Sequence, residues 1–292
     1  MIQYDPHKWM DHFFDVRGTL VKEISVRVLS TVAWAALIVW VDMKVRHIGI
    51  SSLLHQLVGL ALGLLLVFRT NASYDRFWEG RKLWGGIVNE TRNLVRLAAV
   101  HFSDRQMLLR ITKLTALFPY ACMHQLRGTS GSHPEPEYDA LLKAQHGPLA
   151  IARSMTETIK TAKDRGDYGE MVLNSLDNNI QLLIDYQGGC ERIRKTPLPF
   201  AYVVHLRRAL IVYCWTLPFA LVDTFGWYTI LDVLLVSYIF YGIEEIGVEI
   251  EGPFGHDEND LPLEDITATI QHNIYSLVGL EAGEREVMPV GL

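Results

Sequence analysis

Four runs of apolar residues stand out along this chain, and each is long enough to cross a bilayer as a helix. About 20 helical residues span the hydrocarbon core. The runs occupy residues 24–45, 50–68, 209–230 and 228–250, with Arg27 near one end of the first run and Pro218 inside the third. Only a tight turn at residues 225–227 separates the last two. The pattern therefore predicts four transmembrane helices in two hairpins, with a kink at the proline.

The long segment between the second and third runs is polar, but its apolar residues recur at helical spacing. This holds for "LWGGIVNETRNLVRLAAVHF", "MLLRITKLTALFPYACMHQL" and "MVLNSLDNNIQLLIDYQGGCERI". No strand pattern stands out anywhere. We expect an all-α membrane protein with an N-terminal segment at 1–23, transmembrane helices at 24–68, a cytosolic helical region at 69–208, transmembrane helices at 209–250 and an acidic C-terminal segment at 251–292.

The end of the second run raises a specific question. The stretch "GLALGLLLVFRTNASYDRFWEGRKLWG" (59–85) changes from apolar to strongly polar with no proline between, so one helix of about 50–84 would leave the membrane and enter water. Leu60, Leu64 and Phe68 lie at i, i+4 and i+8, on one stripe of that helix. Two interpretations are open. The stripe packs against a neighbouring helix, which Gly59 and Gly63 would allow to approach closely, or it lines a water-filled path.

Large apolar side chains in a water-filled path form a constriction that can gate by dewetting. The polar continuation of the helix beyond Phe68 favours this second interpretation. Four other polar residues interrupt the apolar runs, namely Asp42, His55, Asp223 and Asp232. Since such residues are unfavourable in lipid, we expect them to lie near an interface or to face protein.

The distribution of charge predicts the orientation. Of the 27 Lys and Arg residues, 20 lie between residues 69 and 208, whereas the connections near 46–50 and 223–228 carry little charge. Positive charge accumulates on the cytoplasmic side, so we expect a multi-pass protein of the plasma membrane with both termini in the cytoplasm. A soluble helical protein with buried core helices is the alternative that this asymmetry argues against. The N-terminus lacks the apolar segment of a signal peptide.

Composition narrows the function classes. The net charge is −6, and no basic patch with interleaved aromatic residues occurs, which argues against nucleic-acid binding. Cys122, Cys190 and Cys214 have no metal-ligand spacing, so we expect reduced, buried thiols.

Several acidic residues after the fourth run raise the alternative of a membrane-embedded, metal-dependent enzyme. They are Glu244, Glu245, Glu249 and Glu251, followed by His256. No His-Glu-x-x-His, paired Glu-x-x-His or nucleophile-elbow motif accompanies them. An enzyme and a non-conducting membrane scaffold remain as alternatives to an ion path.

Three motifs resemble those of one known family. "FRTNASYDRFWEGRKLWG", "ERIRKTPLPFAYVVHLRR" and "EGPFGHDENDLPLED" are similar to bestrophins, most closely to their prokaryotic branch, over nearly the whole chain to about residue 275. The resemblance implies a homopentameric channel for monovalent ions, with chloride as the first expectation and cations left open. It also implies a narrow hydrophobic neck on the second transmembrane helix. Aligned on "FRTN", the neck positions are Leu60, Leu64 and Phe68.

The resemblance suggests two further sites. A lower cytosolic constriction made by an aliphatic residue would correspond to Ile180 or Leu183, for each of which core packing is the alternative. Animal bestrophins bind calcium in the segment that matches "EGPFGHDENDLPLED", and Asp257 and Asp260 occupy the matching carboxylate positions. The run is not an EF-hand, it is less acidic than the animal segment, and a solvated loop is the alternative. We expect no cofactor to be required.

Overall fold

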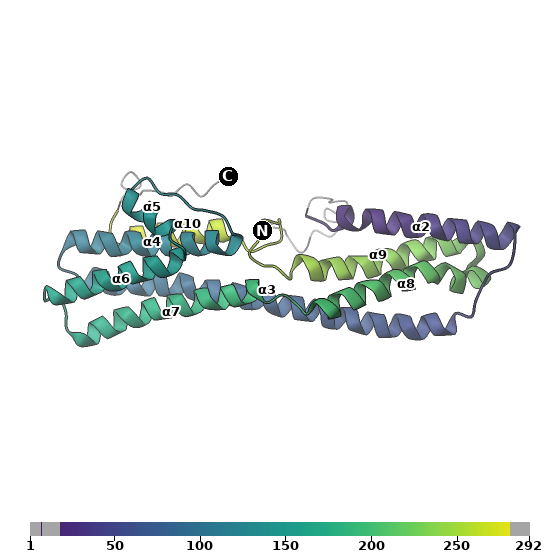
Figure 1. The fold of residues 1–292 in the computed structure, drawn as a ribbon, viewed down its shortest axis with the longest axis horizontal. Helices are drawn as coiled ribbons and strands as arrows, with labels where there is room; N and C mark the ends of the chain where they lie inside the picture. The colour runs from purple at the N-terminus through teal and green to yellow at the C-terminus, as the bar shows by residue number, and fades with distance from the viewer. Residues whose placement is uncertain (1–6, 8–17, 281–292) are drawn as a thin grey trace. The chain divides into compact units, whose positions relative to one another are not determined.

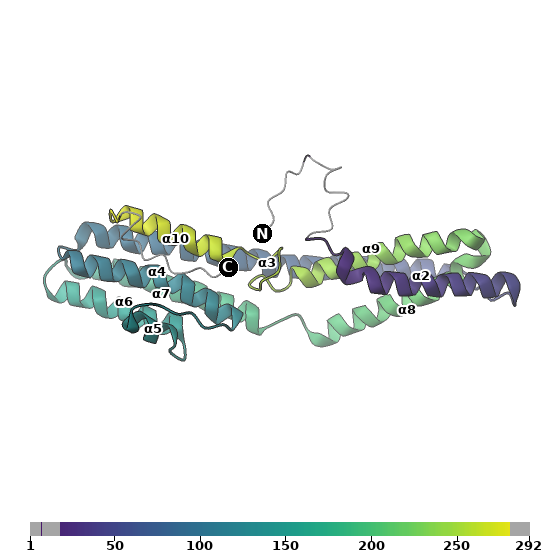
Figure 2. The same ribbon diagram turned by 90° about the horizontal axis from the view of Figure 1, so that it is seen from above.

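A computed structural model of the chain describes residue 7 and residues 18–280, and Figures 1 and 2 show its helices. The elements are α2 (Val21–Lys44), α3 (Leu53–His101), α4 (Arg105–Arg127), α5 (Pro136–Leu142), α6 (Gly147–Asp164), α7 (Glu170–Lys195), α8 (Phe200–Phe225), the 3-10 turn η1 (Gly226–Tyr228), α9 (Thr229–Glu249) and α10 (Leu263–Leu277). These residues contain no β-strand, so the predicted all-α class is confirmed. Most of the expected segment 1–23 and the end of 251–292 lie outside the described residues.

The chain forms two compact units. The first holds the described residues up to Phe77 together with Pro197–Gly252 and Asp257–Asp260, and the second holds Trp78–Thr196, Pro253–His256 and the residues from Leu261 onward. The boundaries predicted at 68/69 and 208/209 mark changes in hydropathy and stay predictions. The compact units instead divide inside α3 and where Pro197 and Pro199 precede α8.

The first unit is built from α2, α8, α9 and the first part of α3, which lie alongside one another (Figures 1 and 2). Its main core contains residues from all four helices, namely Ile24, Val28, Leu62, Leu66, Leu206, Leu210, Cys214 and Tyr241. Three helical stretches in the described residues are long and apolar enough to cross a membrane: Val21–Lys44, Leu53–His101 and Phe200–Glu249. The third contains both α8 and α9. The four apolar runs therefore lie on four helices.

The turn between α8 and α9 is short because a glycine ends α8. Gly226 has a φ of +53°, a backbone conformation that residues with a Cβ rarely adopt. One 3-10 turn then leads directly into α9. The predicted hairpin at residues 225–227 is thus a glycine-terminated reversal.

The second unit packs around α4, which contacts α5, α6, α7 and α10. The side chain of Asp104 caps this helix by accepting a hydrogen bond of 2.8 Å from the backbone N–H of Gln106. At the other end Gly128, with a φ of +70°, terminates it. Much of α4 is buried, including Cys122.

All three cysteines are free and buried, as the sequence predicts. In the second unit, burial raises the pKa of the Cys190 thiol to about 12 and that of Cys122 well above its usual range. Both thiols therefore stay protonated at neutral pH. They act as small apolar core side chains rather than as nucleophiles.

Candidate functional site

The predicted neck stripe lies on an uncovered face of α3. The side chains of Leu60, Leu64 and Phe68 are 77%, 57% and 57% exposed. Leu62 and Leu66, which lie between them in sequence, are buried in the core of the first unit. The two sets face opposite sides of the helix because residues two apart differ by about 200°. Within residues 18–280 the stripe does not pack against other parts of the chain, so lipid, water or another copy is available as its partner.

α3 continues without a break from this apolar segment to the polar residues that follow. The sequence predicted a single helix across that junction, and α3 is one helix from Leu53 to His101. After Phe68 the exposed residues of α3 include the polar Asn71 and Asp75, beside the exposed aromatic side chains of Tyr74 and Trp78. One helix thus presents an apolar surface followed by one that contains polar and charged side chains, as expected of a helix that leaves a membrane.

The two glycines near the stripe differ in their surroundings. A Cβ on Gly59 would lie 2.6 Å from the hydroxyl oxygen of Tyr213, so this glycine allows α8 to approach α3. A Cβ on Gly63 would meet nothing within 4 Å. The close approach predicted from the pair therefore occurs at Gly59 within the described chain.

The first polar residue after the stripe, Arg69, is fully buried and ion-paired. One of its terminal nitrogens lies 2.7 Å from a carboxylate oxygen of Glu251, and the other donates to the hydroxyl of Ser73. The second carboxylate oxygen of Glu251 accepts the backbone N–H of Leu198 at 3.0 Å. This cluster joins α3 to the segments that precede α8 and follow α9.

Gly247 of α9 lies against this arginine, since a Cβ there would stand 3.4 Å from Cγ of Arg69, at ordinary van der Waals contact. The sequence alone assigns no role to the arginine of "FRTN". The available signal was a basic residue directly after an apolar run, which indicates either a charge at the interface or a buried pair. Only the position of Glu251 distinguishes the two.

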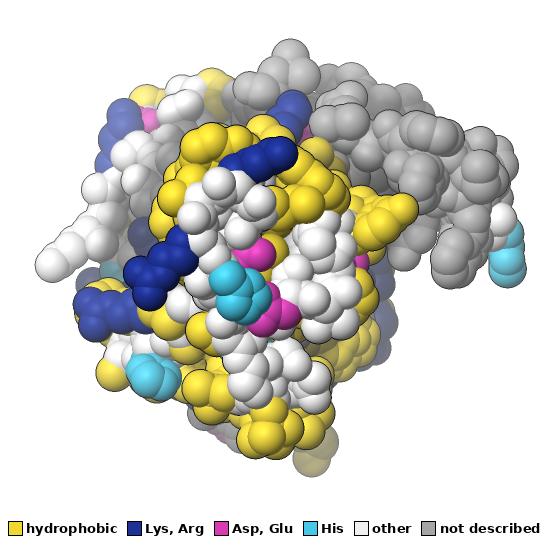
Figure 3. Space-filling view, turned by 90° about the vertical axis from the view of Figure 1, so that its right-hand side faces the viewer, with side chains coloured by type: hydrophobic (Ala, Val, Ile, Leu, Met, Phe, Trp, Pro, Cys, Tyr) yellow, Lys and Arg dark blue, Asp and Glu magenta, His cyan; other side chains and the backbone are white. Residues whose placement is uncertain are grey.

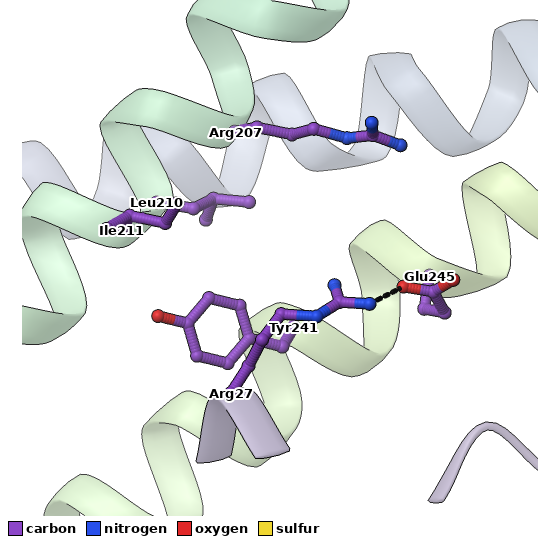
Figure 4. A pocket seen from close by; sticks show the side chains of 6 residues that line it. All are labelled: Arg27, Arg207, Leu210, Ile211, Tyr241 and Glu245. Atoms are coloured by element: carbon purple, nitrogen blue, oxygen red, sulfur yellow. Dashed lines mark hydrogen bonds and ion pairs between the residues drawn. The ribbon is translucent and has the colours of Figure 1, made fainter. Parts of the chain in front are cut away.

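A second ion-pair cluster lines a pocket of about 280 Å³ between α2, α8 and α9 (Figure 4). A terminal nitrogen of Arg27 lies 2.5 Å from the carboxylate of Glu245, and Nε of Arg207 donates to Glu244 at 2.7 Å. The Glu244 side chain is almost fully buried, so removing its arginine partner would leave a buried carboxylate unpaired. The cluster has no net charge and ties three helices of the first unit together.

These pairs account for the acidic residues that raised the enzyme alternative. Glu244 and Glu245 pair with arginines, Glu251 pairs with Arg69, and Glu249 accepts a hydrogen bond from the side-chain amide of Asn259 at 3.1 Å. Each of these carboxylates has its own ion-pair or hydrogen-bond partner. They do not form a common metal-binding cluster among the described residues.

The two candidates for the lower constriction are core residues of the second unit. Ile180 and Leu183 on α7 are 2% and 0% exposed. A side chain that narrows a path must be accessible in the single chain, so this burial favours the packing role. The exposed large apolar side chains of α7 are Met171 and Ile184, and Met171 is the more exposed of the two.

The calcium candidates lie in a tight loop. Asp260 is buried, and its carboxylate accepts the backbone N–H of Asp257 at 2.8 Å. The backbone N–H of Asp260 in turn donates to the carbonyl of Asp257 at 3.0 Å. Calcium takes six to eight oxygen ligands, whereas one of these two carboxylates already closes a turn. The residues therefore fit a structural turn better than a calcium cage, and calcium binding here stays a prediction.

Replacing Asp260 by Ala should lower the stability of the protein even when a chelator is present. The change leaves the N–H of Asp257 without its charged acceptor, which costs about 1–3 kcal/mol. Asp257→Ala is the matched control, since that side chain is exposed and should change stability by no more than about 0.5 kcal/mol. Melting curves with chelator and with added calcium measure both effects. An unchanged melt for Asp260→Ala in chelator, with a calcium-dependent increase in wild type, would favour the calcium site instead.

Comparison with known proteins shows one consistent similarity. A family model described as Bacterial/Fungal Bestrophin protein matches residues 1–276. A protein of Nostoc sp., described as a voltage-dependent anion channel-forming protein, is 39% identical over 95% of this chain and 94% of its own length. A protein of Synechocystis sp. with the same description is 37% identical over 94% of this chain and 93% of its own length.

Solved structures show the same relationship. A crystal structure of a bacterial bestrophin homolog from Klebsiella pneumoniae, obtained by Zn-SAD phasing, superposes with a TM-score of 0.82 at 30% sequence identity. The match covers 88% of this chain and 99% of that one. The similarity thus extends over the fold as well as the sequence.

Proposed function

Since this chain belongs to the bacterial and fungal bestrophin family, we propose that it is a subunit of a homopentameric channel for monovalent anions. The curated relatives are described as channel-forming proteins, and the enzyme alternative is set aside. We propose that four helices of each subunit cross the plasma membrane and that both termini are cytoplasmic. The preference for anions follows the description of the relatives, because an apolar neck has no charged ring that selects a sign.

The exposed stripe of Leu60, Leu64 and Phe68 is the observation that supports this function most directly. One helix cannot enclose a path for ions, so several copies must place their stripes around a common axis. An ion that passes such a ring loses hydration that leucine and phenylalanine cannot replace. The ring would therefore be the main barrier of the channel, and small changes in its width would control the flux.

If α7 supplies a lower constriction, the side chain that forms it must be exposed in the single chain, so that the same residue of other copies can approach it. Met171 satisfies this condition, whereas Ile180 and Leu183 are occupied in the core of the second unit. We therefore place this constriction at Met171. Calcium is not needed for the proposed conduction.

Purified protein in liposomes tests the function. Under an asymmetric KCl gradient, we expect currents whose reversal potential lies near the chloride equilibrium potential. A reversal potential near that of potassium would overturn the anion preference but keep the channel. If the melting curve shows that the protein is folded but no current is recorded, the non-conducting scaffold is favoured. Native mass measurement in mild detergent should give five subunits, and a stable monomer would contradict the neck.

A further inference from the structure

Three side chains of types that can bind a metal lie close together at one end of the first unit, although they come from separate segments. Asp42 lies near the end of α2, His47 in the connection to α3, and Asp223 near the end of α8. Nδ1 of His47 is 3.3 Å from a carboxylate oxygen of Asp42 and 3.5 Å from one of Asp223. The three candidate ligand atoms all lie within 4.8 Å of one another. Figure 3 shows histidine and acidic side chains side by side on this end of the molecule.

The two distances are those of ion pairs rather than of hydrogen bonds, and they also match the spacing of ligand atoms around a metal. N–H···O bonds in proteins measure 2.7–3.2 Å, and both distances from Nδ1 exceed this range. In a tetrahedral zinc site with bonds of about 2.0–2.2 Å, neighbouring ligand atoms are about 3.3–3.6 Å apart. Both measured distances lie in that interval. The separations of Nδ1 from the two carboxylates therefore match two edges of such a tetrahedron, and the two carboxylate oxygens lie within 4.8 Å of each other.

Backbone contacts hold the ligands in this arrangement. The same carboxylate oxygen of Asp42 accepts the backbone N–H of Ile48 at 2.7 Å, which orients it as outer hydrogen bonds orient metal ligands. The backbone N–H of Ile50 donates to the carbonyl of Phe219 on α8 at 2.9 Å, fixing the connection against that helix.

Gly49 provides a second, independent constraint. A Cβ at this position would lie 1.8 Å from a carboxylate oxygen of Asp223, so any side chain would displace that group. The absence of a side chain lets the carboxylate lie against the connection beside His47. The connection is thus shaped to receive the ligand from α8.

We propose that Asp42, His47 and Asp223 bind a divalent transition metal of the Zn²⁺ class, with water completing the coordination. Two carboxylates neutralise the charge of a divalent ion, and an imidazole favours zinc and its neighbours over calcium or magnesium. His47 is largely exposed, so the site is open to solution. The metal joins the α2–α3 connection to the end of α8. This site is independent of the neck and of the proposed conduction.

Zinc binding to the chelator-stripped full-length protein, without a histidine tag, tests the site. Isothermal titration should give one zinc per chain, and the melting temperature should rise with zinc concentration. His47→Ala should abolish both effects while the metal-free melt stays unchanged, because this side chain is mostly exposed. His205→Ala, at an exposed histidine of α8 in the same unit, is the matched control and should bind zinc like wild type.

Cobalt provides a readout of the ligands themselves. Co²⁺ should give the visible absorption of a four-coordinate ion in wild type and in His205→Ala, and lose it in His47→Ala. The site is refuted if wild type binds no zinc, or if His47→Ala binds zinc with unchanged stoichiometry and affinity. Asp223→Asn should weaken binding at least tenfold, and His47→Ala decides the question if Asp223→Asn fails to fold.

Discussion

Replacing Leu64 by Ala is expected to raise the ion flux of the reconstituted channel by about tenfold, equivalent to a barrier lower by about 1.4 kcal/mol. Leu64 lies between Leu60 and Phe68 on the exposed stripe of α3. In a ring of subunits the smaller side chain widens the neck and admits water, so an ion loses less of its hydration. Stability should change little, because the Leu64 side chain is 57% exposed and belongs to no core of the described part of the chain. Flux measurements on liposomes, together with a melting curve, check both statements.

Leu62→Ala is the matched control, since it makes the same substitution two residues away on the same helix. Leu62 is buried in the core of the first unit. Its truncation leaves a cavity and should cost about 2–5 kcal/mol of stability, while the flux per folded channel stays near wild type. If Leu64→Ala instead lost stability to this extent with unchanged flux, the stripe would be a packing surface between copies and the gate would lie elsewhere.

Replacing Arg69 by Met should destabilise the protein by about 3–5 kcal/mol, the usual effect of removing one partner from a buried ion pair. The guanidinium of Arg69 is fully buried, and its loss leaves the carboxylate of Glu251 without its cation. Arg69→Lys should not restore the wild-type stability. The two terminal nitrogens of the guanidinium contact Glu251 and Ser73 separately, and a single ammonium group cannot occupy both positions. Denaturation of the purified protein measures the loss.

Two further variants separate this ion pair from a general effect of charge removal. Arg153→Met removes an exposed arginine that pairs with Glu157 on α6, and it should change stability by no more than about 0.5 kcal/mol. Adding Glu251→Gln to Arg69→Met should recover part of the loss, because no unpaired charge remains. An Arg69→Met protein that unfolds like wild type would show that the pair does not hold the first unit together.

Local pattern was sufficient to predict the long apolar helices, α4, α7 and the candidate stripe, but it did not identify α5, α6 or α10. Runs of apolar residues of sufficient length specify α2, α8, α9 and the start of α3, since a bilayer requires the backbone to satisfy its own hydrogen bonds. Helical periodicity also placed Leu60, Leu64 and Phe68 on one line. Such a pattern fixes the angle between side chains on one helix. It contains no information on which side of that helix its neighbours cover.

The other features of the site were determined by the packing of segments that are distant in sequence, which a local pattern does not describe. Ile180 and Leu183 have the apolar character expected of a constriction, yet neighbouring helices bury both. The pairing of Arg69 with Glu251, and the meeting of His47 with Asp223, join residues far apart in sequence. Each depends on how α8 and α9 return beside α2 and α3. The sequence shows which side chains have the chemistry to pair. Which two of them do pair is determined only when packing brings them within bonding distance.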